Sequence, residues 1–164
     1  RIIEPLALTS LQLDLETNGQ AQWATGYARR RDRQVVRAPE EAHYWKHGGG
    51  GYKSDVADFA RWANGLINHR LVTVESERLM WTLQKTSEGR ETTFGLGFVP
   101  YSREYGQLLG HGGSQPEAKT VLAINPSTRF GIVVMSNCNH CRPTEVAAAL
   151  ATACGQDFSA LASR

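Results

Sequence analysis

The sequence lacks several features that would point directly to a class of function. No apolar run approaches the roughly 20 residues that a membrane-spanning helix requires. The 18 basic and 16 acidic residues leave a net charge of +2, which is too close to neutral for a protein that binds nucleic acid electrostatically. The three cysteines exclude a zinc site of four thiolates within the chain.

The start of the chain also lacks a methionine and a targeting segment, since it opens Arg1-Ile2-Ile3. We therefore expect the chain to be processed or to be part of a larger protein. What is present is the composition of one globular domain, because 164 residues with 41% hydrophobic side chains are enough for one core and too few for two. The 16 glycines among 164 residues are a larger share than the average of about 7%. They predict tight turns and close approaches of the backbone.

Apolar periodicity and capping residues predict three helices. The first covers 55–68 and is expected to begin after Ser54 as its N-cap. The second covers 74–85, with Thr73 as its cap. Its buried stripe is expected to consist of Leu79, Met80 and Leu83. A closing helix over 143–154 follows from a proline at its first turn and a glycine after its end.

Extended segments separated by short connections fill the last third of the chain. We expect strands over 93–99, 107–113, 119–125 and 130–137. Connections this short favour antiparallel pairing. The fold class predicted is therefore α+β, an antiparallel sheet flanked by helices. It forms one domain over 1–164, divided into an extended arm (1–42), a helical segment (43–90), antiparallel strands (91–137) and the closing helix (143–154).

Three segments resemble chemical motifs only in part. The glycine-rich run 47–54 lacks the last glycine of a phosphate-binding loop before Lys53-Ser54, so a loop that flanks a site is favoured over phosphate binding. The Cys138-Asn139-His140-Cys141 segment favours free thiols or a local disulfide, with a redox or metal role as the alternative. The basic cluster 29–33 favours a solvated turn over a phosphate or nucleic-acid patch.

The most informative segment is Gly110-His111-Gly112-Gly113-Ser114-Gln115-Pro116. A histidine followed by two glycines on a strand places a polar side chain beside unobstructed backbone. A substrate amide or carboxylate can then add hydrogen bonds to that backbone. The alternative is a histidine beside a glycine-rich hairpin, with no chemistry.

This segment carries a resemblance to a known family. His111-Gly112-Gly113 resembles the third motif of serine β-lactamases and penicillin-binding proteins, which is K-T-G in many members and H-x-G in many esterase and D-aminopeptidase relatives of class C β-lactamases. Further segments resemble the family's motifs in the same order, so that the resemblance spans about residues 2–154. They are Glu4-Pro5-Leu6, Ala24-Thr25-Gly26-Tyr27, residues 49–54 with Asp58 and Phe59, and Phe94-Gly95-Leu96-Gly97-Phe98.

Two motifs of that family do not occur in the chain. No serine is followed three residues later by lysine, and no tyrosine is followed two residues later by asparagine. The family's S-x-x-K supplies the nucleophilic serine with its base, and its Y-x-N supplies a tyrosine. The resemblance therefore implies the C-terminal part of a β-lactamase-like serine hydrolase, and it implies that the isolated chain is inactive.

The resemblance also implies roles for particular residues. His111 lines the site, the backbone N–H of Ser114 supplies half of an oxyanion hole, and Gly112, Gly113 and Gln115 contact substrate. One departure is Glu117, which stands where a small residue is expected in the turn after H-x-G.

No cofactor and no metal are implied. The partners implied are a small-molecule substrate (a β-lactam, a D-amino acid peptide or an ester) and an N-terminal part that carries the two missing motifs. We also expect the isolated chain to self-associate through the surface that this part would cover. The alternative is a non-catalytic, ligand-binding derivative of the same fold. Many relatives act in the bacterial envelope and others in the cytoplasm, so the compartment stays open.

Overall fold

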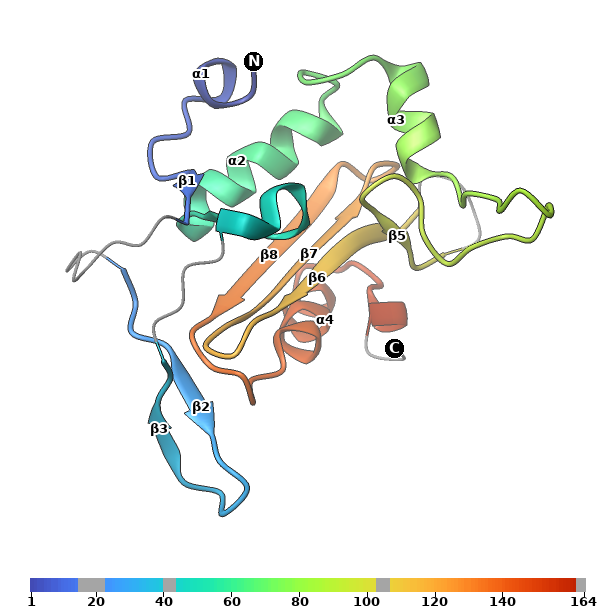
Figure 1. Ribbon diagram of the computed structural model, residues 1–164. Helices are drawn as coiled ribbons and strands as arrows, with labels where there is room; N and C mark the ends of the chain where they lie inside the picture. The colour runs from blue at the N-terminus through green and yellow to red at the C-terminus, as the bar shows by residue number, and fades with distance from the viewer. Residues whose placement is uncertain (15–22, 40–43, 103–106, 162–164) are drawn as a thin grey trace.

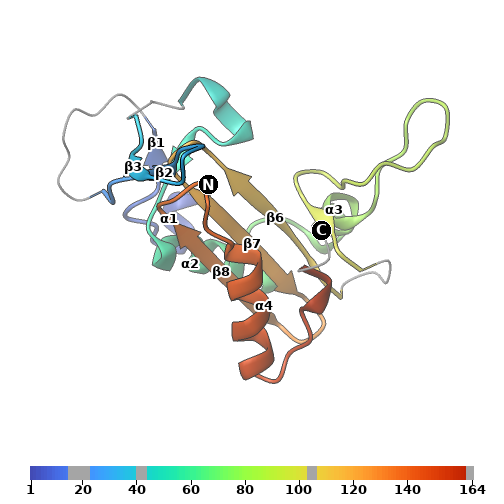
Figure 2. The same ribbon diagram turned by 90° about the horizontal axis from the view of Figure 1, so that it is seen from below.

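The computed structural model describes residues 1–14, 23–39, 44–102 and 107–161. An antiparallel sheet lies at its centre and has the order β5-β6-β7-β8. Helices α2 and α3 cover one face of the sheet and helix α4 covers the other (Figures 1 and 2). The four strands are β5 (Val99–Pro100), β6 (Leu109–Ser114), β7 (Lys119–Asn125) and β8 (Phe130–Ser136). The predicted α+β class, an antiparallel sheet flanked by helices, is confirmed.

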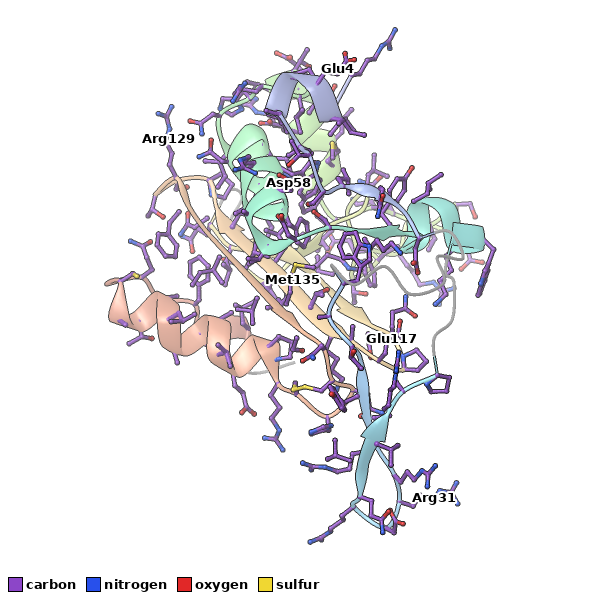
Figure 3. All side chains as sticks on the ribbon, turned by 90° about the vertical axis from the view of Figure 1, so that its left-hand side faces the viewer. Glu4, Arg31, Asp58, Glu117, Arg129 and Met135 are labelled. Carbon is purple, nitrogen blue, oxygen red and sulfur yellow. A yellow bond between two sulfur atoms is a disulfide. The ribbon has the colours of Figure 1, made fainter. Side chains whose placement is uncertain are left out.

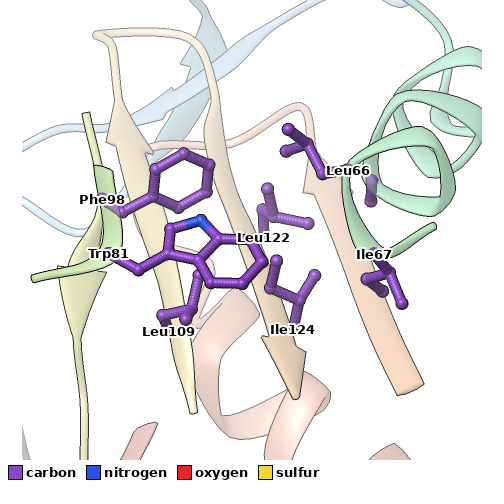
Figure 4. Packing of buried hydrophobic residues seen from close by; sticks show 8 residues of the cluster. Leu66, Ile67, Trp81, Phe98, Leu109, Leu122 and Ile124 are labelled. Atoms are coloured by element: carbon purple, nitrogen blue, oxygen red, sulfur yellow. The ribbon is translucent and has the colours of Figure 1, made fainter. Parts of the chain in front are cut away.

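Strand β7 is the inner strand around which the core is built. Its residues alternate between the two faces of the sheet, as the period of a strand requires. Leu122 and Ile124 pack with the helix pair, as Figure 4 shows, whereas Val121 and Ala123 pack toward α4. All four side chains are almost completely buried. Two cores on opposite faces therefore fix the register of β7 against both neighbours.

The expected strand over 93–99 shortens to β5. The segment before it instead folds back toward the end of α3, where the Leu96 N–H donates to the Met80 carbonyl at 2.9 Å. A Cβ on Gly95 would lie 2.1 Å from that same carbonyl oxygen, and Gly97 has a φ of +79°. The two glycines permit a close turn here, which a regular strand does not contain.

The three predicted helices form with adjusted ends. Helix α2 (Val56–Ile67) is capped by Asp55, whose side chain accepts the Asp58 N–H at 2.8 Å. The cap is therefore one residue later than expected, because the Ser54 hydroxyl bonds elsewhere. Helix α4 (Pro143–Ala153) has a proline in its first turn and the φ > 0 glycine after its end, as expected.

Helix α3 (Val74–Trp81) begins after the predicted Thr73 cap, which accepts the Ser76 N–H, but it ends four residues before the predicted end at 85. The predicted buried stripe is wrong for Leu79, which is 64% exposed. Trp81 takes the buried place instead and packs among the apolar residues of Figure 4.

The N-terminal segment is more structured than the extended arm expected over 1–42. It begins with a helical turn, α1 (Ile3–Leu6), whose Leu6 packs over Gly65 of α2. Strand β1 (Gln12–Leu13) pairs with β4 (Tyr52–Lys53), and β2 (Tyr27–Arg29) pairs with β3 (Val35–Arg37). Short 3₁₀ helices η1 (Tyr44–Gly49) and η2 (Ser159–Leu161) complete the order. Residues 15–22 and 40–42 of the expected arm lie outside the described residues.

The β2–β3 hairpin projects from the sheet, with Arg31 of the basic cluster at its tip (Figure 3). Residues 29–33 are all exposed, as expected for a solvated turn. Cys138 and Cys141 form a disulfide, and Cys154 is an exposed free thiol. Within the described residues, no helix is long and apolar enough to cross a membrane.

Candidate functional site

The candidate site is the end of strand β6, where four consecutive residues, His111 to Ser114, are all exposed. The first two residues of the strand, Leu109 and Gly110, are buried. A strand within a sheet normally buries at least one face, so exposure on both faces marks the point where the sheet stops being covered. The predicted H-x-G segment therefore lies at the surface, on a strand that the core holds at its other end.

The hairpin after β6 fixes the direction of its backbone groups. The Gln115 N–H donates to the Ala118 carbonyl at 2.8 Å, and the Ala118 N–H donates back at 3.4 Å. These two residues are thus a hydrogen-bonded pair, and pairs in an antiparallel ladder alternate between bonded and non-bonded. The next pair, Ser114 with Lys119, is then non-bonded. The N–H and C=O of Ser114 therefore point away from β7.

The same alternation turns the backbone of Gly112 outward. Two residues earlier in the strand, the backbone N–H and C=O of Gly110 point toward β5, where Gly110 pairs with Val99. The pairing of β5 with β6 covers only Leu109 and Gly110. Within the described residues, no strand continues this pairing along Gly112 and Ser114. We call this stretch, Gly112 to Ser114, the open edge.

His111 lies beside the open edge with a defined tautomer. His111 lies on the same face of the sheet as Leu109, which precedes it by two residues. The centroid of the His111 ring is 6.1 Å from the centroid of the Phe94 ring. The Nδ1 atom lies 2.7 Å from the Gly112 carbonyl oxygen. Because a carbonyl only accepts, Nδ1 carries the proton and the lone pair of the neutral ring is on Nε2. The exposed His111 thus offers a proton acceptor next to two outward N–H groups.

The glycines of the segment have different structural needs. A Cβ on Gly110 would lie 1.9 Å from the backbone oxygen of Leu122, and one on Gly113 would lie 2.5 Å from the Thr120 hydroxyl. A Cβ on Gly112 would find only the Thr120 carbonyl at 3.8 Å, an ordinary contact. Gly110 is therefore required for strand pairing, whereas the fold leaves Gly112 open to substitution.

Gln115 is held by the glycine-rich segment before β4. Its Oε1 accepts a hydrogen bond from Lys46 Nζ, and a Cβ on Gly50 would lie 3.5 Å from its Nε2. Lys46 Nζ also lies 5.2 Å from the centroid of the Trp45 ring. Lys46, in η1 directly before the glycine-rich run 47–54, thus places a positive charge at the turn that ends β6. The contacts of Lys46 with Gln115 and of Phe94 with His111 were not predicted from the sequence, because contacts between residues so far apart in the chain have no local pattern.

Glu117, the departure from the family's pattern, packs against the β2–β3 hairpin. A Cβ on Gly26 would lie 2.3 Å from the Glu117 Cβ, and Figure 3 shows Glu117 beside the base of that hairpin. Gly26, in the segment that resembles A-x-G-Y, is therefore needed for this contact. The Glu117 side chain therefore packs against the hairpin.

The described serines next to the motifs have structural partners. The Ser54 hydroxyl lies 3.2 Å from that of Ser10 and donates to the Asp55 carbonyl at 3.1 Å. The Ser136 hydroxyl donates to the Lys119 carbonyl at 2.7 Å. Neither hydroxyl has a basic group in these bonds, and a serine nucleophile needs one.

The strongest perturbation of a carboxyl group lies away from the open edge, at the start of α2. Asp58 is fully buried and accepts hydrogen bonds from the Ser10 N–H at 2.5 Å, from the Ser10 hydroxyl at 2.8 Å and from the Arg61 guanidinium. The Ser10 N–H, foremost among these donors, helps lower the pKa of Asp58 to about 2, against the opposing effect of burial. This network ties the N-terminal segment to α2 and has no part in the open edge.

Among the described residues, the group with donors suited to hold a metal also lies elsewhere, in the loop between β8 and α4. A hollow of about 480 Å³ between α1 and α2 is lined by Leu6, Ala57, Ala60, Arg61, Asn64 and Arg70. It does not include the open edge, which is a surface and not an enclosed pocket.

Comparisons with known proteins agree with this arrangement. A family model described as Beta-lactamase matches residues 1–155. The structure is similar to a D-stereospecific amidohydrolase from Streptomyces sp. (TM-score 0.73, 18% identity, 95% of this chain and 47% of that chain). It is also similar to a penicillin binding protein from Bacillus halodurans (TM-score 0.71, 17% identity, 93% of this chain and 47% of that chain). A third similar structure is a class C beta lactamase from Rhodobacter sphaeroides (TM-score 0.66, 18% identity, 94% of this chain and 52% of that chain). No curated protein matches the chain. The chain thus spans about half the length of these structures.

Proposed function

The chain belongs to the Beta-lactamase family, and from this premise we propose that it forms one wall of the acyl-transfer site of a serine hydrolase. In this proposal the chain supplies the H-x-G strand and half of the oxyanion hole. The nucleophilic serine, its lysine and the tyrosine belong to an N-terminal part. The observation that carries the proposal is the open edge, where the Ser114 N–H points away from the sheet beside the Nε2 lone pair of His111.

The open edge has the chemistry that acyl transfer needs from this side. The serine Oγ forms a bond to the substrate carbonyl carbon, and its proton passes to the base. The carbonyl oxygen becomes an anion, which the Ser114 N–H and the N–H of the nucleophilic serine stabilise; such a preorganised donor contributes about 2.7–4 kcal/mol. The bond to the leaving group then breaks, the leaving group takes the proton, and water later releases the acyl group by the reverse sequence.

The residues around the open edge favour a particular class of substrate. An extended amide can lie along Gly112 and Ser114 and bond to their outward N–H and C=O groups. Lys46 supplies a positive charge at the turn through its bond to Gln115, so a substrate with a carboxylate is favoured over a cationic one. Because the similar Streptomyces protein is a D-stereospecific amidohydrolase, we infer an amide, peptide or β-lactam with a free carboxylate, with esters as the alternative.

The first test asks where the nucleophile lies. The purified chain, treated with a fluorophosphonate or a penicillin, is expected to form no covalent adduct by intact-mass analysis. The complete protein is expected to be labelled once, on a serine outside residues 1–164. Stoichiometric labelling of a serine within the chain would overturn the proposed division of the site.

The second test asks what His111 does in the complete protein. His111→Ala is expected to lower kcat/KM by about tenfold or more, because general acid–base groups contribute about 10²–10⁴-fold. Arg31→Ala, at the tip of the hairpin, is the matched control and is expected to leave kcat/KM unchanged. A wild-type value for His111→Ala would show that the histidine is structural.

The non-catalytic alternative rests on the absence of S-x-x-K and Y-x-N from the chain. It predicts that the complete protein binds a penicillin reversibly, with no acylated species by mass. Equilibrium dialysis with labelled penicillin, before and after denaturation, distinguishes the two functions, because only an acyl-enzyme survives denaturation.

A further inference from the structure

The loop between β8 and α4 brings together two thiol sulfurs and an imidazole. One donor atom each from Cys138, His140 and Cys141 lies within 4.8 Å of the other two. Cys138 is buried, and His140 and Cys141 are half-buried. In this structure the two sulfurs are joined as a disulfide, and the two Cα atoms are 5.5 Å apart. The proposed acyl-transfer site leaves this cluster unused, because β7 lies between β6, which carries the open edge, and β8, which precedes the loop.

The three donors are of the kind that zinc prefers. Thiolates and imidazoles are common zinc ligands, and two cysteines separated by two residues are a typical element of such sites. The loop also ends at Pro143 in the first turn of α4. The positive end of the helix dipole therefore lies close to Cys141 and favours its thiolate over its thiol.

The orientation of His140 is supported by a second layer of contacts. The Asn139 Oδ1 accepts the backbone N–H of Arg29 at 2.9 Å, which identifies this atom as the amide oxygen. The same oxygen lies 3.4 Å from His140 Nδ1. An acceptor at this place puts the proton on Nδ1 and the lone pair on Nε2. Histidines that bind metals commonly donate their other N–H to such an oxygen.

We propose that the reduced form of this loop binds one zinc ion through Cys138, His140 and Cys141. A dithiol reductant first gives two electrons and two protons to the Cys138–Cys141 disulfide and becomes a disulfide itself. Zinc then binds the two sulfurs and the imidazole lone pair, and the two thiol protons are released to solvent. Three protein donors leave a fourth coordination position for water.

The loop also anchors the β2–β3 hairpin. The Tyr27 N–H donates to the Asn137 carbonyl at 2.8 Å, and the Asn139 N–H donates to the Tyr27 carbonyl at 3.1 Å. Disulfide and zinc are therefore two cross-links for the same anchor, one suited to oxidising and one to reducing conditions. The proposal stands independently of the proposed function, because no residue of the open edge takes part.

The test uses the spectroscopy of cobalt as a substitute for zinc. The protein carrying Cys154→Ala, which removes the free thiol, is reduced with dithiothreitol, freed of reductant under nitrogen and titrated with Co²⁺. We expect one ion per chain, with the thiolate-to-cobalt absorption of a tetrahedral site, and we expect zinc to displace it. The oxidised protein is expected to bind no cobalt in this way. Binding by the oxidised protein, or none by the reduced protein, overturns the proposal.

His140→Ala distinguishes a three-donor site from chance binding to two thiols. This variant keeps both cysteines and so can still form the disulfide that the fold contains. We expect its zinc affinity to fall by at least about tenfold, since even the loss of an outer-shell partner costs about 10–100-fold. Far-UV circular dichroism and the count of two reactive thiols after reduction check that the variant is folded and competent. An unchanged affinity for zinc would overturn the role of His140 and with it the proposed site.

Discussion

At the scale of single residues, backbone geometry decides what β6 can do. Its glycines are not equivalent: Gly110 faces the backbone of the next strand at a distance that no Cβ tolerates, whereas Gly112 has free space beside it. The fold thus excludes a side chain at Gly110. At Gly112, only a ligand bound along the open edge would limit the size of a side chain. This difference separates a requirement of folding from a requirement of function.

The two glycines therefore give a matched pair of variants. Gly110→Ala is expected to lower the free energy of unfolding by about 1–3 kcal/mol, because the strand must shift to accept the added methyl group. Gly112→Ala is expected to change stability by less than about 0.5 kcal/mol. Urea unfolding, followed by circular dichroism, measures both. Equal losses in the two variants would contradict the register described for β6 and β7.

At the scale of elements, a polar network attaches the N-terminal segment to helix α2. The Asp58 carboxylate accepts the N–H and the hydroxyl of Ser10, and the Ser10 hydroxyl in turn accepts the Asp55 N–H at 2.9 Å. One serine thus contributes to the cap of α2 from a distant part of the chain. The ion pair with Arg61 adds charge balance on the exposed side. This attachment depends on Asp58 being ionised.

The network predicts a dependence of stability on pH. The pKa of Asp58 falls from 3.8 to about 2 in the folded protein, so the folded state favours the ionised form. Its contribution is complete above about pH 4 and is lost as the pH falls toward 2. We expect Asp58→Asn to lower the Tm at pH 6, and we expect the difference from wild type to narrow as the pH approaches 2.

Glu88→Gln is the control for this series, because Glu88 lies on the surface with a side chain that is 68% exposed. Its Tm is expected to follow the wild type at every pH, since exposed ion pairs contribute little. A difference between wild type and Asp58→Asn that stays constant from pH 6 to pH 2 would show that the charge of Asp58 does not stabilise the fold.

At the scale of the whole molecule, the sheet ends at β8, whose outer side has no neighbouring strand in the described part of the chain. Only at its end does the hairpin approach, through the bridge of Tyr27 with Cys138. Met135 is partly exposed on this strand, at the centre of Figure 3. Unpaired strand edges are sites of association between chains. Because the chain spans about half the length of similar structures, we expect another segment or chain to pair here.

The isolated chain is therefore expected to associate through β8 as its concentration rises. Met135→Lys places a charge on this strand and is expected to shift the weight-average mass toward the 18.1 kDa of the monomer. Leu150→Lys, on the exposed face of α4, makes the same change away from the edge and is expected to have no such effect. Sedimentation over a range of concentrations compares the two. A larger effect of Leu150→Lys would place the contact on α4.

Much of the fold could be predicted because its signals are local. The periodicity that predicts α2, the Thr73 cap, the proline and glycine that bound α4, and the short turns between the last strands all act within a few residues. The predicted ends of elements were wrong where a contact with a distant part of the chain determined the end. Helix α3 ends early because Gly95 and Leu96 fold back onto Met80, and no pattern within 74–85 indicates that contact.

The sequence by itself determined the α+β class, the antiparallel order of the last strands and the series of motifs, H-x-G among them, that resembles the family, because hydrophobic period, turn residues and motifs depend on neighbouring positions. Only the tertiary structure decided which backbone groups of β6 point outward, since this depends on the pairing of Gln115 with Ala118. It also decided that Lys46 reaches Gln115 and that Asn139 joins His140 to the hairpin. Such contacts join residues far apart in the chain, and their geometry exists only once the core has brought them together.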